Sequence, residues 1–148
     1  MTKNRLLIVD DEVHILELLR YNLESSGYEV IQAESGEEAL EKLKIIKVNG
    51  VILDLMLPGI DGIEVLRQIR QSDHMLLPVI MLTAKNEEID AVIGLEMGAD
   101  DYIGKPFRTR ELISRVKSVL RRAQLREESY KKHEEVLDFY KNHHLEST

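Results

Sequence analysis

Runs of apolar residues alternate along this chain with stretches in which apolar residues recur every three or four positions. Residues 6–9, 51–55 and 78–82 are nearly continuous apolar runs, a pattern typical of strands that are buried on both faces of a sheet. Weaker runs at residues 29–33 and 101–103 predict two further strands, and we expect the first of these at an edge of the sheet.

Each apolar run is followed by a segment whose apolar residues share one face of an α-helix. These segments begin near Val13, Ser35, Gly62, Glu87 and Arg108, and the start at Ser35 carries a capping box. Strands that alternate with helices predict βαβ units. The fold class is therefore α/β, with a doubly wound parallel sheet that has helices on both faces.

The composition fits one folded domain, since 148 residues suffice for a single core. The net charge of −7 argues against direct nucleic-acid binding by this chain, and the absence of cysteine excludes disulfides and cysteine zinc sites. No run approaches the roughly 18 apolar residues that span a membrane, and the apolar residues before Asp10 are too few for a signal peptide. We expect a cytoplasmic protein with no membrane partner.

Polar residues follow the predicted strands at the points where the strands end. Asp10 and Asp11 follow the first strand, Asp54 ends the third, Thr83 follows the fourth and Lys105 follows the fifth. Taken singly, the acids and the threonine could cap helices and the lysine could be solvated. Because parallel strands end at the same edge of a sheet, all five side chains are instead expected in one cleft.

Three converging carboxylates repel one another and favour a hard divalent cation such as Mg²⁺ or Mn²⁺. A carboxylate can also accept a phosphoryl group and form an aspartyl phosphate. Phosphoryl transfer depends on positioning and on charge neutralisation, which a metal, a lysine and a threonine hydroxyl can supply.

On these residues the chain resembles the receiver domain of two-component response regulators. The resemblance covers residues 5 to about 123 and rests on Asp10-Asp11, Leu53-Asp54, residues 56–62, Leu82-Thr83-Ala84, residues 98–102 and Lys105-Pro106-Phe107. The run from Gly98 to Phe107 and the pair Arg121-Arg122 resemble the OmpR/PhoB-type subfamily. The resemblance implies a flavodoxin-like, CheY-like (βα)₅ fold with strand order 2-1-3-4-5.

The resemblance also implies roles for individual residues. Asp54 would be the phosphoacceptor, and the phosphoryl donor would be a phosphohistidine on a sensor histidine kinase. Asp10, Asp11, Asp54 and the backbone carbonyl of Met56 would hold the metal, Thr83 and Lys105 would bind the phosphate, and Tyr102 would be the aromatic switch. Lys105-Pro106 is expected to be a cis peptide. No enzymatic activity is expected beyond self-phosphorylation from a donor and self-dephosphorylation.

A homodimer is implied through the surface of the fourth helix, fifth strand and fifth helix. Its charged residues would be Asp100, Asp101, Glu111, Arg115 and Lys117. Ala91 departs from the subfamily, which commonly carries Lys or Arg there, paired with the acid corresponding to Glu111. Exposed ion pairs contribute under about 1 kcal/mol, so the change is expected to weaken or alter the dimer without abolishing it.

Residues 1–123 form the predicted receiver domain, and residues 124–148 are interpreted as a helical or flexible extension or linker. Residues 126–148 contain neither Pro nor Gly, and residues 136–140 carry an apolar cluster. The cluster is interpreted as part of a solvated helix, and the alternative is packing on the domain or on a partner. No part of the chain resembles the DNA-binding output domain of the subfamily, so transcription control would act through a domain absent from this chain.

Other functions stay open as alternatives. A stand-alone receiver would act through a protein partner. An aspartate-dependent phosphatase usually needs an acid two residues after its nucleophile, where this chain has Met56. A flavodoxin-like cofactor binder would need a phosphate loop after the first strand, where the acidic run 10–12 would repel phosphate. An interaction module with an inactive site is disfavoured by the full set of five polar residues.

Overall fold

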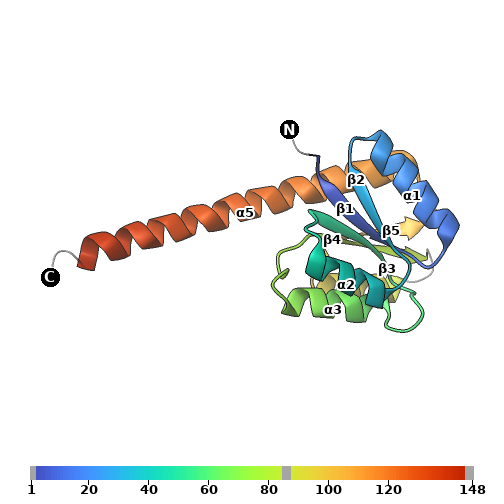
Figure 1. The fold of residues 1–148 in the computed structure, drawn as a ribbon, viewed down its shortest axis with the longest axis horizontal. Coiled ribbons are helices and arrows are strands. Elements are labelled where there is room, and N and C mark those ends of the chain that lie inside the picture. Colours follow the sequence, from blue (N-terminus) through green and yellow to red (C-terminus); the bar gives the residue numbers. More distant parts are fainter. Residues whose placement is uncertain (1–2, 85–87, 146–148) are drawn as a thin grey trace.

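A computed structural model describes residues 3–84 and 88–145 of the chain. Within these described residues, five strands alternate with five helices, as the pattern predicts (Figure 1). The elements are β1 (Arg5–Val9), α1 (Val13–Ser25), β2 (Glu29–Ala33), α2 (Gly36–Ile45), β3 (Gly50–Asp54), α3 (Gly62–Gln71), β4 (Val79–Ala84), α4 (Glu88–Glu96), β5 (Asp101–Lys105) and α5 (Thr109–Leu145).

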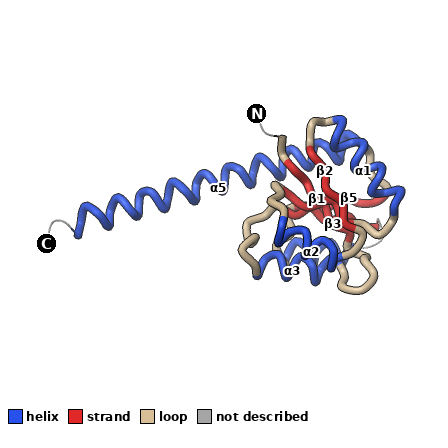
Figure 2. The backbone as a smooth tube through the Cα atoms, in the orientation of Figure 1, coloured by secondary structure: helices blue, strands red, loops and turns tan. Residues whose placement is uncertain are grey.

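The strands form one parallel sheet in the order β2-β1-β3-β4-β5, so β2 is an edge strand as expected. Figure 2 shows the strands of this sheet in red. The predicted α/β class and the order implied by the family resemblance are both confirmed. The order reverses between β1 and β3, and in such sheets ligands bind beside this reversal, at the carboxyl ends of the strands.

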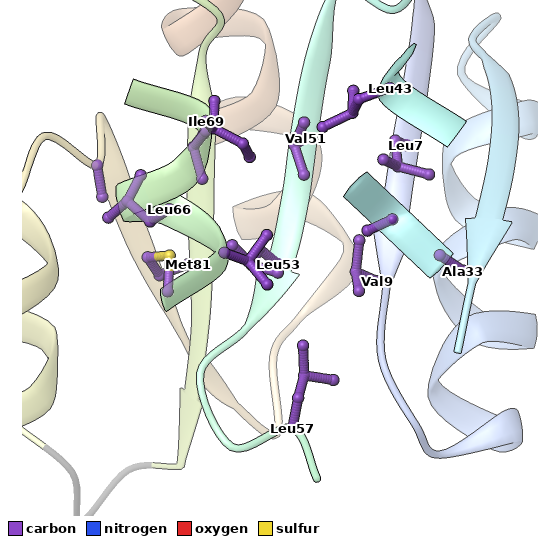
Figure 3. Packing of buried hydrophobic residues seen from close by; sticks show 14 of the residues in the cluster. Leu7, Val9, Ala33, Leu43, Val51, Leu53, Leu57, Leu66, Ile69 and Met81 are labelled. Atoms are coloured by element: carbon purple, nitrogen blue, oxygen red, sulfur yellow. The ribbon is translucent and has the colours of Figure 1, made fainter. Parts of the chain in front are cut away.

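Alternate residues of each central strand face two separate cores. Leu7, Val9, Val51, Leu53 and Met81 face the layer of α2 and α3, whose Leu43, Leu66 and Ile69 fill the gap (Figure 3). The opposite face of the sheet carries the intervening strand residues, which pack on α1 and α5. Burial on both faces explains why these strands read as continuous apolar runs in the sequence.

The fifth strand is longer than the sequence pattern predicts. We expected it to end at residue 103, with Lys105 in a turn, but β5 continues to Lys105. The extension follows from pairing with β4, because Thr83 lies opposite Gly104 and Ala84 lies opposite Lys105. The Lys105-Pro106 peptide is cis, as implied by the resemblance.

Helix α5 has 37 residues and runs far past the sheet (Figure 1). It passes without interruption through residues 123 and 124, the boundary between the predicted domain and its extension. The apolar cluster at 136–140 does not pack on the domain, because Val136, Leu137, Phe139 and Tyr140 are 43–63% exposed. In the part of the chain that is described, no helix has the length and apolar composition needed to cross a membrane.

Candidate functional site

The register of the sheet brings Asp10 and Asp54 to the same level on neighbouring strands. Val9 of β1 lies opposite Leu53 of β3, and each aspartate is the next residue in its chain. Both side chains are buried, with 0% and 4% of the residue exposed. Asp10 Oδ1 accepts a hydrogen bond from the backbone N–H of Glu12, and Asp54 Oδ1 accepts one from the backbone N–H of Met56.

Close packing of the following helix fixes the backbone at Asp54. The backbone N–H of Gly62, the first residue of α3, donates to the carbonyl of Leu55 at 3.0 Å. A Cβ atom at Gly62 would lie 2.3 Å from the carbonyl oxygen of Asp54, which no side chain can tolerate. Asp61 caps the same helix by accepting a hydrogen bond from the N–H of Glu64. The sequence pattern gives no signal for the close approach of Gly62, although the Asp61–Glu64 spacing marks the helix start beside it.

Lys105 reaches past β4 to both buried acids. Its ammonium nitrogen lies 2.8 Å from Asp10 Oδ2 and 3.2 Å from Asp54 Oδ2, and its side chain is only 18% exposed. Burial alone would lower the pKa of Lys105, but the hydrogen bonds and charges of Asp10 and Asp54 outweigh it and raise that pKa. Lys105 is therefore not a solvated loop lysine, the alternative for this residue taken singly, but lies with Asp10 and Asp54 at the strand ends.

In the metal-free protein, the surroundings of Asp54 disfavour the ionised form of its carboxyl group. Burial is the largest cause, and the negative charge of Asp10 adds to it, so the pKa of Asp54 is raised above 3.8. Lys105 and the Met56 N–H act in the opposite direction but do not cancel the effect. The site is thus short of positive charge, which a bound cation would supply.

Three carboxylates form a cluster that fits a divalent cation. One oxygen from each of Asp10, Asp11 and Asp54 lies within 4.8 Å of the others. Asp11 is exposed, so the cluster opens to solvent on one side. Clustered carboxylate oxygens are the ligands that Mg²⁺ and Mn²⁺ prefer, and the donor set therefore fits such an ion.

The remaining predicted site residues lie at the same edge. Thr83 is the penultimate residue of β4 and is 4% exposed. The described part of α4 begins at Glu88. Met56 follows the strand end and is 60% exposed. Tyr102, on the edge strand β5, is 41% exposed. The structure therefore brings Asp10, Asp11, Asp54, Thr83 and Lys105 to one end of the sheet.

The predicted dimer residues separate into two groups. Arg115 of α5 pairs within the chain with Asp101 at 2.9 Å and with Glu111 at 3.2 Å, all on one face of β5 and α5. Lys117 lies elsewhere, on the wall of a groove of about 720 Å³ at the opposite end of the sheet. The side chain of Ala91 lies outside the described residues.

Asp100 has a role that the sequence did not reveal. Its side chain is 12% exposed and accepts hydrogen bonds from the backbone N–H of Val79, from Arg70 at 3.2 Å and from Arg126 at 2.9 Å. It therefore joins β4, α3 and the extended part of α5. Sequence spacing gives no signal of this network, because its members are distant in the chain.

Comparison with known proteins agrees with this geometry. Residues 6–117 match the family model described as the response regulator receiver domain. The chain belongs to the response regulator receiver domain family. Proteins of this family are phosphoacceptor switches of two-component systems. The aspartate cluster, Thr83 and Lys105 occupy the strand ends of this receiver domain.

Among curated relatives, the receiver domain is 55% identical over 121 residues to the alkaline phosphatase synthesis transcriptional regulatory protein PhoP of Bacillus subtilis. That match covers 82% of this chain and 50% of PhoP, so the chain spans about half the length of this relative. A CheY-like receiver domain protein of Methanospirillum hungatei has a similar structure, with a TM-score of 0.79, 33% identity and coverage of 84% of this chain and 99% of that one. NtrX of Brucella abortus gives a TM-score of 0.83 at 32% identity, covering 88% of this chain and 29% of NtrX.

Proposed function

We propose that Asp54 accepts a phosphoryl group from the phosphohistidine of a sensor histidine kinase. The observation that carries this proposal is the position of Asp54, a buried carboxylate held between two other acids and the ammonium group of Lys105. In the transfer, a carboxylate oxygen of Asp54 forms a bond to phosphorus while the bond to the histidine nitrogen breaks.

The neighbouring groups support this reaction through charge and position. Asp10, Asp11, Asp54 and the backbone carbonyl of Met56 would hold Mg²⁺ or Mn²⁺, which neutralises charge on the phosphoryl oxygens when bound. Lys105 would exchange its contact with Asp54 for a phosphoryl oxygen. The hydroxyl group of Thr83 would donate a hydrogen bond to another.

The output of the switch is proposed to be a surface change. Phosphorylation adds nearly two negative charges, and a phosphoryl group that binds Thr83 and Lys105 better in one arrangement shifts the population toward it. Tyr102, exposed on the neighbouring edge strand, would turn inward in that arrangement. A homodimer through α4, β5 and α5 would follow, using the face of Asp101, Glu111 and Arg115.

Transcription control through a DNA-binding output domain is the proposed cellular outcome. This part of the proposal rests on the relative PhoP, which is a transcriptional regulatory protein. We also propose a cytoplasmic location, because PhoP is a transcriptional regulatory protein.

The chemistry can be tested with acetyl phosphate as donor. Phosphoryl incorporation with Mg²⁺ and none with a chelator would support the proposal. Equal incorporation with and without the metal would contradict it.

A further inference from the structure

Beyond the domain, α5 carries a stripe that continues its own buried face. Within the domain the helix packs through Leu112, Val116 and Val119, which are 0–1% exposed. Alternating steps of four and three residues from Val119 reach Ala123, Arg126, Tyr130, His133, Leu137 and Tyr140. This alternation is a heptad repeat, in which the first and fourth of every seven positions face a partner helix.

The outer part of this stripe is exposed. We define the tail seam as Tyr130, His133, Leu137 and Tyr140. Tyr130, Leu137 and Tyr140 are 55%, 43% and 57% exposed, and among the described elements none runs beside this part of α5 (Figure 1). Isolated helices are marginal in water, and most helices in proteins are stabilised by packing of one apolar face. The seam therefore has the pattern and exposure of a helix-pairing surface.

We propose that the tail seam binds the same segment of a second copy of this chain, with the two helices antiparallel. The seam lies on the side of α5 that packs on the sheet, because both belong to one heptad pattern. A parallel second helix on that side would run into the sheet of the first copy. An antiparallel helix instead points its C-terminal end toward the first domain and carries its own domain at the far end.

Reversal of one helix places the first heptad position opposite the fourth. Tyr130 then faces Tyr140 of the second copy, and His133 faces Leu137 of the second copy. The two-fold axis repeats each pair, since the same surface is used by both copies. The side chains of these residues would thus be removed from water in four successive layers of paired residues.

Charges beside the seam fit the same register. Glu127 and Lys141 occupy equivalent heptad positions, so each faces the other across the antiparallel pair, twice by symmetry. Val136 meets its own mate near the two-fold axis. The arrangement also brings Glu134 opposite its mate, so Glu134→Gln is expected to tighten the dimer.

This dimer is independent of the proposed phosphorylation. None of the seam residues belongs to the face of Asp101, Glu111 and Arg115, and the seam lies on the part of α5 that projects beyond the domain (Figure 1). The unphosphorylated chain and Asp54→Asn should therefore pair through the tail equally well. Failure of the tail dimer would leave the phosphoacceptor proposal intact, and the reverse also holds.

Sedimentation equilibrium of the full chain tests the seam. We expect a monomer–dimer equilibrium that Leu137→Asp weakens at least about tenfold. Phe139→Asp is the matched control, because Phe139 is an exposed aromatic residue off the seam that stacks on His143 of its own helix at 3.8 Å. It should leave the equilibrium unchanged. A monomeric wild-type chain, or equal effects of the two variants, would overturn the proposal.

Disulfide trapping tests the orientation, because the chain has no cysteine of its own. A disulfide requires Cα atoms within about 7 Å. Residues 130 and 140 of one helix lie about 15 Å apart, so they cannot bridge within a chain. The double variant Tyr130→Cys/Tyr140→Cys should form covalent dimers on oxidation, and neither single variant should. Cross-linking of the single variants would show a parallel pair, and absence of cross-linking in the double variant would refute the register.

Discussion

Lys105 and Asp54 form an ion pair across the end of the sheet, with 3.2 Å between the ammonium nitrogen and Oδ2 of the carboxylate. The two residues lie on β5 and β3, so the lysine side chain passes the end of β4 between them. The same nitrogen lies 2.8 Å from Asp10. The ammonium group of Lys105 is therefore the positively charged partner of two buried acids, while Asp11 adds a third negative charge nearby.

This shortage of positive charge predicts that Asp54→Asn stabilises the metal-free protein. The ionised carboxyl group is disfavoured by burial and by Asp10, and the amide removes that penalty. We expect the free energy of unfolding to rise by on the order of 1 kcal/mol near neutral pH, measured by urea denaturation in a chelator.

The pH dependence of that difference follows from the sign of the pKa shift. Because the pKa of Asp54 is raised above 3.8, the native state keeps a proton that the unfolded chain has released. The penalty is therefore present above the native pKa and disappears as the pH falls through it. The stability advantage of Asp54→Asn should shrink toward pH 4, and an advantage that grows at low pH would contradict this explanation.

Removal of Asp11 should weaken divalent-cation binding without unfolding the protein. Asp11 is the exposed member of the cluster, so its loss leaves the buried packing in place. We expect Asp11→Ala to lower the affinity for Mg²⁺ about tenfold or more, measured by calorimetric titration. Glu12→Ala is the control, since Glu12 lies next to the cluster but outside it. Unchanged affinity in Asp11→Ala would rule out the assigned ligand role.

Gly62 should tolerate no side chain. Gly62→Ala would force its Cβ against the carbonyl oxygen of Asp54 at 2.3 Å, so the loop must move. We expect a loss of about 1–3 kcal/mol in the free energy of unfolding and slower phosphorylation. Gly94→Ala is a matched control in α4, where the new Cβ meets Met81 at an ordinary 3.6 Å and should be neutral or stabilising. Equal effects of the two changes would contradict the packing argument.

Asp100 is predicted to be a structural residue. Asp100→Ala leaves the backbone N–H of Val79 without its acceptor and Arg70 without its charge partner, which should reduce the free energy of unfolding by about 2–3 kcal/mol. The neighbouring Asp101→Ala removes a pair with the partly exposed Arg115 and should cause a smaller loss. Thermal denaturation of both variants distinguishes the two roles.

The sequence was sufficient to predict the parallel sheet and the residues that gather at its strand ends. Apolar runs identify buried parallel strands, and Asp10 and Asp54 then follow from the rule that parallel strands end at one edge. The same rule placed Lys105 in the cleft, but its place as the last residue of β5 could not be predicted, because the apolar run stops at Ile103. The pairing of Ala84 with Lys105 decides where β5 ends, and that pairing depends on the folded sheet.

The inward position of Asp100 was also beyond the sequence. We expected this residue on a dimer face with Asp101, but Asp100 lies just before β5 and its side chain is only 12% exposed. This burial depends on Arg70 of α3 and Arg126 of α5, and these residues meet only in the tertiary structure.

Intact-mass spectrometry after incubation with acetyl phosphate and Mg²⁺ tests the central claim most directly. The wild-type chain should gain one phosphoryl group, and Asp54→Asn should gain none. Asp61→Asn changes a nearby acid that caps α3 and should still be phosphorylated. An unchanged mass of the wild-type chain, or a phosphoryl group on Asp54→Asn, would contradict the assignment of Asp54 as the phosphoacceptor.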